Sequence, residues 1–165
     1  MSTPLHSGGS SGIVSAFPAT GKTYYAERHP NVLDSDSSSF SWISPDGFLK
    51  RDERQRHPDW PHNYIRHIKE QVHQGKLVLV STHGEVRGLL EDQELSFTLV
   101  YPAFDLRTYY LKRMVDRGSP RWLVDKIDLM WPSMLAELEA QRGCRHVVLR
   151  RGEYLSDALE ANVRA

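Results

Sequence analysis

The sequence predicts an α/β fold in which a five-stranded parallel β-sheet lies between layers of helices. Short apolar segments typical of buried strands alternate along the chain with longer segments whose apolar residues recur at helical spacing. This alternation favours parallel strands joined by right-handed crossovers. The 165 residues are enough for one domain with a full core and too few for two. We therefore expect a single domain over residues 12–165.

The clearest strand is expected at 76–82 (KLVLVST), which follows Gly75 and contains the continuous apolar run 77–80. The other strands are expected at the start of 12–23 and at 31–34, 96–101 and 146–149. Helices are expected at 23–28, 61–74, 104–117 and 121–141, within 83–94, and from residue 156 onward. Pro132 would kink the longest of these helices.

The composition argues against several classes of function. Lys and Arg together number 21, as do Asp and Glu, so the formal net charge is zero and no overall basic field favours duplex nucleic acid. The single cysteine, Cys144, cannot form an internal disulfide and fits a reducing compartment. No apolar run approaches the ~20 residues that cross a bilayer, and the Ser/Gly-rich residues 1–11 read as a flexible arm, not a signal peptide. We expect a cytoplasmic protein, monomeric or homodimeric.

The segment 12–23 (GIVSAFPATGKT) carries the strongest functional signal. An apolar strand, a compact loop and Gly-Lys-Thr at a helix start follow in the order that a phosphate-binding loop requires. Loop amides and the helix dipole would attract an anion, Lys22 would reach the terminal phosphates, and the Thr23 hydroxyl would ligate Mg²⁺. Gly21 permits a close backbone approach to phosphate. The expected nucleotide-binding residues are Ala16 (where a glycine is usual), Phe17, Pro18, Ala19, Thr20, Gly21, Lys22 and Thr23.

Two acids follow the second strand. In an open α/β sheet, ligands gather outside the carboxyl ends of the strands. We therefore expect Asp34 and Asp36 beside the loop, where either can hold Mg²⁺ through water or accept a proton from a substrate. The alternative is turn chemistry, because Asp and Ser commonly build turns and cap helices.

Several arginines are candidates for phosphate contacts. Arg87 lies just past the third strand, although a lone helical arginine is usually a solvated surface residue. Arg113 and Arg117 share a helix face at a spacing of four, and Arg121 follows the break at 118–120 (GSP). Arginines around such a break suit a lid that closes over a polyphosphate, the alternative being a solvated basic face. The later loop at 150–155, which includes Tyr154, would lie against the base of a nucleotide.

These motifs together resemble the P-loop kinases of small molecules. The loop 16–22 (AFPATGK) is similar to that of nucleoside monophosphate kinases, including its proline at position 18. The triplet 34–36 (DSD) is similar to the Asp-x-Asp element of shikimate kinase. The combination of 17–23 (FPATGKT), 33–42 (LDSDSSSFSW) and 99–102 (LVYP) resembles nucleotide kinases encoded by bacteriophages. The resemblance covers about residues 12 to 155.

The resemblance implies a three-layer P-loop NTPase fold with ATP and Mg²⁺ as cofactors, a substrate-binding helical region at about 37–75 and a lid at about 113–122. Its usual acid at the end of the third strand is replaced by Ser81-Thr82, which shifts metal binding to Asp34 or Asp36. The implied catalytic residues are Lys22, Asp34, Asp36, Arg113 and Arg117, and the implied metal ligands are Thr23, Asp34 and Asp36. Arg117 and Tyr154 would also contact ATP. The acceptor would contact Asp34, Asp36, Phe40, Trp42, Tyr64, Arg87 and Arg121, with the three aromatic residues stacking on its base.

The expected reaction is transfer of the γ-phosphoryl of ATP to a deoxynucleoside monophosphate, in the host cytoplasm if the chain is phage-encoded. An acceptor phosphate is already a nucleophile, so this chemistry needs positioning and charge neutralisation more than a strong base. One alternative is a kinase of a small hydroxylated metabolite, resembling shikimate or gluconate kinase, with Asp34 or Asp36 as the base. Another is a nucleotide-hydrolysing switch, for which the sequence offers no acid at the end of the third strand. A 5′-polynucleotide kinase receives little support from the zero net charge.

Overall fold

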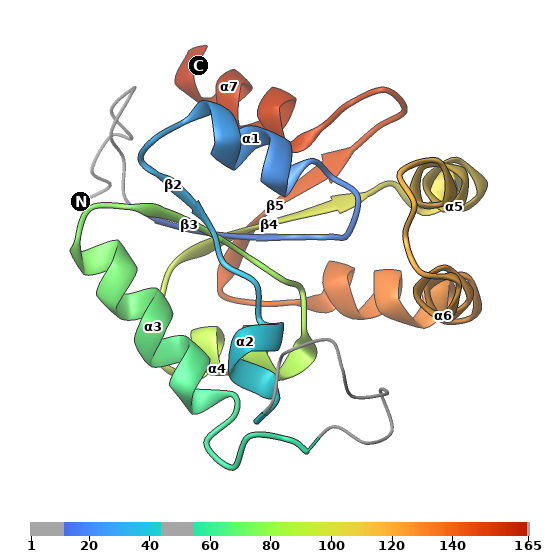
Figure 1. The fold of residues 1–165 in the computed structure, drawn as a ribbon. Helices are drawn as coiled ribbons and strands as arrows, with labels where there is room; N and C mark the ends of the chain where they lie inside the picture. The colour runs from blue at the N-terminus through green and yellow to red at the C-terminus, as the bar shows by residue number, and fades with distance from the viewer. Residues whose placement is uncertain (1–11, 44–54, 165) are drawn as a thin grey trace.

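The computed structural model describes residues 12–43 and 55–164 (Figure 1). The expected N-terminal arm at 1–11 and part of the expected substrate region, 44–54, lie outside the described residues. Among the described residues, no helix combines the length and apolar character needed to span a membrane.

The centre of the structure is a five-stranded sheet with the order β2-β3-β1-β4-β5. Its strands are β1 (Gly12–Ala16), β2 (Val32–Asp34), β3 (Leu77–Val80), β4 (Phe97–Pro102) and β5 (Cys144–Leu149), and every neighbouring pair is parallel. Because parallel strands need crossover connections, helices link them and cover the sheet. The prediction of a five-stranded parallel sheet flanked by helices is confirmed.

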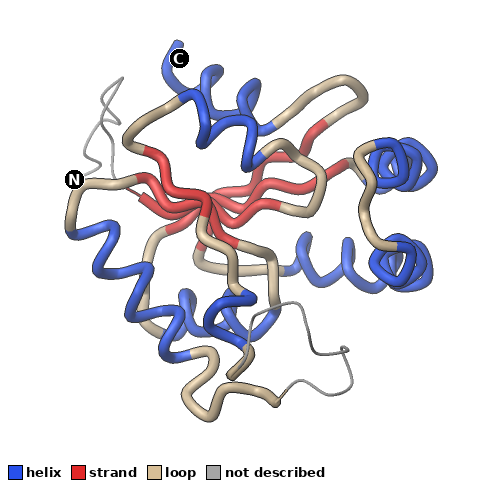
Figure 2. The backbone as a smooth tube through the Cα atoms, viewed as in Figure 1, coloured by secondary structure: helices blue, strands red, loops and turns tan. Residues whose placement is uncertain are grey.

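Side chains alternate between two cores, one on each face of the sheet. Helices α1 (Lys22–Arg28) and α7 (Leu155–Arg164) cover one face, where Tyr25 and Leu155 pack on Val14, Leu79 and Val100. The opposite face packs against α3 (His62–His73), α4 (Gly84–Asp92) and α6 (Arg121–Ala140), so the sheet forms the middle layer of three (Figures 1 and 2). The strands β1, β3, β4 and β5 have side chains in both cores, because successive residues of a strand point to opposite faces.

Two helices follow β4 and continue the second core. The short 3-10 helix η2 (Phe104–Leu106) leads into α5 (Arg107–Asp116), and α5 packs on α6 through buried Tyr110 and Met114. Gly118, with φ 83°, makes the left-handed turn between them, as expected from the break in the sequence. Pro132 lies inside α6 as expected, and the helix changes direction along its length (Figure 1).

The expected element boundaries agree with the structure to within two residues at most ends. The exception is the start of the 104–117 helix: its first turn is η2, and α5 begins at Arg107. A four-residue helix, α2 (Ser38–Ser41), follows β2 within the expected helical region at about 37–75, but it was not predicted as a separate helix. Helices this short lack the periodicity on which sequence-based prediction depends.

Candidate functional site

The loop between β1 and α1 lies at the carboxyl rim of the sheet, beside the central strand. Its first residue is anchored where Phe17 N donates to Val100 O over 2.9 Å. The Phe17 ring is fully buried and packs edge-on against Tyr110 and Trp131, with centroids 6.1 and 5.6 Å away. Phe17 can therefore contact a ligand only through its backbone.

The middle of the loop has an unusual backbone conformation. Ala19 and Gly21 both have left-handed φ angles, 66° and 96°. A Cβ on Gly21 would lie 3.4 Å from Tyr154 Cδ1, so both the φ angle and the nearby ring favour glycine here. Within the described residues, the backbone amides of Gly21, Lys22 and Thr23 have no hydrogen-bond acceptor. The amides of three successive residues are thus available to an anion.

The alanine at the position of the usual first glycine has a structural explanation. Ala16 is the last residue of β1 and pairs in regular register with Val100. It is fully buried, and its φ is not in the left-handed region. Because Ala16 is still part of a strand, the loop that follows does not require glycine there.

Lys22 crosses the loop and closes it. Its Nζ donates to Ala16 O over 2.9 Å, joining the end of β1 to the start of α1. Burial lowers the pKa of this ammonium from 10.5 to about 8, Asp34 and Asp36 oppose the shift, and Arg117 adds to it. The two carboxylates only partly compensate the burial of this ammonium, and a bound phosphate would stabilise its charged form.

The two acids have different surroundings. Asp34 Oδ2 accepts a 2.8 Å hydrogen bond from Thr23 Oγ1, so the end of β2 and the start of α1 meet at the loop. Asp36 instead accepts from Ser38 N at 2.9 Å and Ser38 Oγ at 2.8 Å, which is local turn chemistry at the start of α2. The structure brings Asp34 into contact with the loop, whereas Asp36, which is close enough to raise the pKa of Lys22, forms the turn that was its alternative.

The oxygen atoms at this place suit Mg²⁺. Thr23 Oγ1 and Asp34 Oδ2 are hard oxygen donors, the type that Mg²⁺ prefers, and a nucleotide would add phosphate oxygens. Among the residues that the structure describes, no group of three or more His, Cys, Asp or Glu side chains could hold a metal ion. At the end of β3, the Ser81 hydroxyl is buried and has no hydrogen-bond partner in the described residues. A metal here would thus depend on the nucleotide for several ligands.

Arg113 contacts the loop directly. Its Nη1 donates to Ala19 O over 2.9 Å, and its guanidinium lies 4.2 Å from the centroid of the Tyr154 ring. Tyr154 follows β5 and is 43 % exposed beside Gly21. Leu155 N, the next residue, donates to Thr20 O over 2.8 Å. These contacts place the 150–155 loop beside the phosphate loop, and its expected contact with the base of a nucleotide stays a prediction.

The two other arginines of the expected lid differ from each other. Arg117 is close enough to lower the pKa of Lys22, and its Nε donates to Ser119 Oγ over 2.7 Å. The Arg121 side chain is 90 % exposed and pairs with Asp125 one turn along its own helix, 3.3 Å away. Of the three, Arg113 and Arg117 are near the loop in this structure, whereas Arg121 bonds along its own helix, to Asp125.

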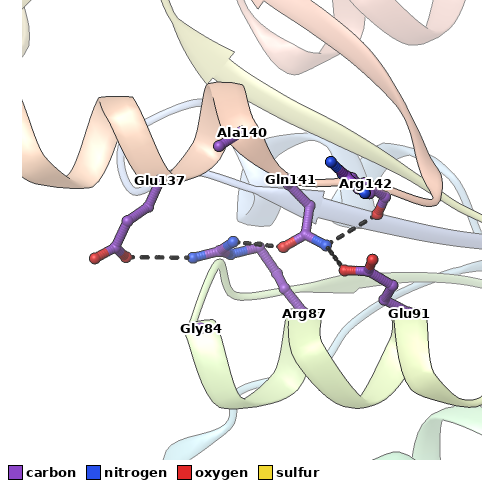
Figure 3. Close-up of a pocket in the computed structure, with 7 residues that line it drawn as sticks. All are labelled: Gly84, Arg87, Glu91, Glu137, Ala140, Gln141 and Arg142. Atoms are coloured by element: carbon purple, nitrogen blue, oxygen red, sulfur yellow. Dashed lines mark hydrogen bonds and ion pairs between the residues drawn. The ribbon is translucent and has the colours of Figure 1, made fainter.

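Arg87 is not at the loop. Its guanidinium is buried between α4 and the end of α6, where Nε donates to Thr82 O at 2.9 Å and Nη1 to Gln141 Oε1 at 2.6 Å (Figure 3). Nη2 lies 3.7 Å from Glu137 Oε2. The interpretation of Arg87 as a ligand of the acceptor phosphate therefore needs correction, because protein atoms already engage its donors. Gln141 is 54 residues away in the sequence, so sequence spacing did not indicate this contact.

The three aromatic residues expected to stack on the acceptor base differ in their burial and contacts. Tyr64 is fully buried and its hydroxyl donates to Ser35 O over 2.8 Å, so its expected stacking on a substrate base is wrong: the ring is part of the core. Phe40 is half-buried between Tyr64 and His67, with centroid distances of 5.3 and 4.7 Å. Trp42 is half-buried, and the Arg56 guanidinium lies 4.4 Å from its ring centroid.

The structure adds residues to this region that sequence reasoning missed. Arg56 lies near Trp42, Trp60 stacks on Tyr64, and His83 meets the Trp60 ring edge-on. The only signal available beforehand was compositional, a segment from 43 to 61 rich in charge, Pro and Trp with no clear period.

Comparison with models of known protein families finds no match for this chain, and comparison with curated proteins finds no significant relative.

Proposed function

We propose that this protein is an ATP-dependent phosphotransferase that converts a nucleoside or deoxynucleoside monophosphate to its diphosphate. The observation that carries the proposal is the closure of the loop by Lys22, whose buried ammonium donates to Ala16 O beside the Thr23–Asp34 pair. The sheet order, with the loop following the middle strand, is compatible with a P-loop fold. The resemblance of the loop and acid motifs to nucleotide kinases supplies the reaction.

The loop would bind the phosphates of ATP. The amides of Gly21, Lys22 and Thr23 are available as donors, and Lys22 adds a positive charge that needs no large movement to meet an anion. Arg113 is stacked on Tyr154 and bonded to Ala19 O, so it is positioned at the same loop before any ligand arrives. Positioned positive charge of this kind stabilises the charge that develops during phosphoryl transfer.

Thr23 and Asp34 would hold Mg²⁺, the first through its hydroxyl and the second directly or through water. When bound, the ion would neutralise charge on the transferring phosphates. The acceptor phosphate is itself the nucleophile, so no side chain has to remove a proton. The proposal places the reaction in the cytoplasm, with nucleotides as the partners.

A kinase of a small alcohol is the second candidate, and the position of Asp34 favours it. Only Oδ2 of this carboxylate has a described hydrogen-bond donor, so Oδ1 at the sheet rim could accept a proton from a hydroxyl group. The two candidates differ in whether the acceptor brings its own phosphate.

The test is a panel of acceptors incubated with ATP and Mg²⁺, with the products separated by chromatography. The panel holds the common and modified deoxynucleoside monophosphates together with shikimate and gluconate. The proposal expects a diphosphate from at least one monophosphate and no product from Lys22→Ala. Turnover of a hydroxylated metabolite with every monophosphate inert would favour the second candidate, and acceptor-independent hydrolysis would favour a switch.

A further inference from the structure

Three side chains near the end of β2 form a cation–aromatic cluster: Trp42, Arg56 and Trp60. Trp42 and Arg56 form an isolated antiparallel bridge, and the Arg56 guanidinium lies 4.4 Å from the Trp42 ring centroid. The same guanidinium lies 5.8 Å from the centroid of Trp60. Both distances are within the range of cation–π attraction. Arg56 is exposed and the two rings are half-buried, so the cluster is open to solvent on one side.

Trp60 is fixed by the elements around it. Its indole Nε1 donates to Glu85 Oε2 at the start of α4. Its ring stacks on Tyr64 with centroids 5.7 Å apart and meets His83 edge-on at 5.9 Å. A ring held from three sides offers a ligand a rigid apolar surface at little entropic cost.

A chain of contacts connects this cluster to the phosphate loop. Trp60 stacks on Tyr64, and the Tyr64 hydroxyl bonds to Ser35 O. Ser35 directly follows Asp34, whose carboxylate accepts the hydrogen bond from Thr23. The cluster and the Thr23–Asp34 pair therefore both lie at the carboxyl rim of the β2 and β3 strands, where ligands of open α/β sheets gather.

Positive charge acts on His83, which meets the Trp60 ring edge-on. Burial, and after it the charge of Lys126, lowers the pKa of His83; Arg56 and Arg87 lower it further, and Glu85 alone opposes them. Glu85 is itself engaged by the Trp60 indole. Arg87 is paired with Glu137, so Arg56 and Lys126 are the cations that act near Trp60, which favours an anionic ligand over a neutral one.

From this geometry we infer that Trp42, Arg56 and Trp60 form the binding site of the acceptor, and that the acceptor is an aromatic ring carrying a phosphate. The inference rests on the proposed function and deepens it. A guanidinium stacked face-on to a ring keeps its edge N–H groups free to point sideways, where they can grip a phosphate bidentately. The indole rings would stack on the base. A small aliphatic hydroxy acid would leave these rings unused.

The test measures binding of acceptors to the full chain by isothermal titration. The probes are deoxythymidine monophosphate and deoxyadenosine monophosphate, with deoxyribose 5-phosphate lacking the base, deoxythymidine lacking the phosphate, and shikimate. The variants are Arg56→Gln and Trp60→Leu. Arg66→Gln is the matched control, because Arg66 is an exposed arginine of the same region that pairs with Asp59. Circular dichroism confirms that each variant is folded.

The inference expects Arg56→Gln to raise the Kd of the best monophosphate at least about tenfold, as loss of a charge-assisted contact does, and to leave deoxythymidine binding unchanged. Trp60→Leu should weaken the monophosphate and the nucleoside alike, and Arg66→Gln should change neither. Equal monophosphate binding by Arg56→Gln and Arg66→Gln would overturn the inference, as would tighter binding of shikimate than of any monophosphate.

The same titrations with Mg²⁺-ATP separate this inference from the proposed function. If ATP binds and no monophosphate does, the acceptor site is wrong and the nucleotide loop stands. If monophosphates bind in an Arg56-dependent way and ATP does not, the acceptor site stands and the kinase proposal fails. Should Trp60→Leu prove unfolded, the contrast between Arg56→Gln and Arg66→Gln still decides the outcome.

Discussion

Thr23 Oγ1 donates to Asp34 Oδ2 over 2.8 Å, and this contact joins the start of α1 to the end of β2 at the mouth of the loop. The acid two residues later does not share it, because both oxygens of Asp36 accept from Ser38. Asp34 and Asp36 looked equivalent in the sequence. In the structure Asp34 is a candidate metal ligand and Asp36 forms a turn before α2, so the two acids should respond differently to substitution.

We predict that Asp34→Asn and Asp36→Asn have different consequences for metal use. Asp34→Asn should raise the Mg²⁺ concentration needed for half-maximal activity by about tenfold or more, because a carboxylate near the ion is lost. Asp36→Asn should leave this concentration within about twofold and lower the free energy of unfolding by about 1 kcal/mol, typical of a weakened local hydrogen bond. Magnesium titrations of the initial rate, together with urea unfolding, measure both. If the two variants needed the same Mg²⁺ concentration, the different roles assigned to Asp34 and Asp36 would be contradicted.

The lowered pKa of Lys22 predicts a pH dependence of nucleotide binding. In the free protein this pKa is about 8. A bound triphosphate stabilises the charged ammonium, so ATP affinity should fall as the pH rises through about 8, and binding should take up a proton in that range. Titrations at pH 7 to 9.5, repeated in buffers of different ionisation enthalpy, measure the uptake. Lys22→Met should abolish this proton uptake, and uptake that persists in the variant would assign it to another group.

The same shift predicts how Lys22 affects stability. The folded pKa lies below the unfolded value of 10.5, so between about pH 8 and 10.5 the unfolded chain binds more protons, and the contribution of Lys22 to stability rises with pH. Below about pH 8 the buried charge is a constant cost. Lys22→Met should therefore be more stable than the natural protein at pH 7, and the difference should shrink by pH 9.5. Urea unfolding at the two values of pH measures this, and a difference that grows with pH would contradict the assignment.

Arg87 should be a structural residue. Arg87→Ala removes the hydrogen bonds to Thr82 O and Gln141 and leaves buried acceptors, so we expect a loss of about 2 to 4 kcal/mol in the free energy of unfolding. The KM for the acceptor should stay within about twofold. Arg87→Lys keeps the charge without the fork of donors and should still destabilise the protein. A stable Arg87→Ala variant with a greatly raised acceptor KM would restore the original interpretation of Arg87.

Arg113 and Arg121 provide a matched pair within the expected lid. Arg113→Ala should lower kcat/KM for ATP by about tenfold to a hundredfold, because it removes a guanidinium bonded to Ala19 O at the loop. Arg121→Ala should change it by less than about threefold, since Arg121 is 90 % exposed and paired with Asp125. Steady-state kinetics with ATP varied gives both values. A larger effect at Arg121 would indicate that α6 moves over the loop when ATP binds.

The fold could be predicted from local sequence because its signals are local. The run at 76–82 is apolar on both faces, the helices carry their apolar residues at regular spacing, and the loop motif fixes where β1 ends and α1 begins. The position of Asp34 followed from the general rule that ligands gather at the carboxyl rim. Each of these inferences needs only residues close together in the chain.

The side-chain partners could not be predicted in the same way. Arg87 is held by Gln141, 54 residues later, and nothing in either local sequence indicates the other. Tyr64 lies on the apolar face of its helix as expected, but only the packing of Phe40 and Trp60 around it shows that no ligand can reach it. Arg56 reaches Trp42 through an isolated bridge outside any strand, which has no periodic signature. Contacts between distant segments decide which candidates are exposed at the site.

The most direct test of the account is isothermal titration of Mg²⁺-ATP into the natural protein and into Lys22→Met. The account predicts saturable binding of one nucleotide per chain by the natural protein and a Kd at least about tenfold higher for the variant, because the ammonium that closes the loop at Ala16 O is gone. The absence of ATP and GTP binding by the folded natural protein, or equal affinity in the two proteins, would contradict it.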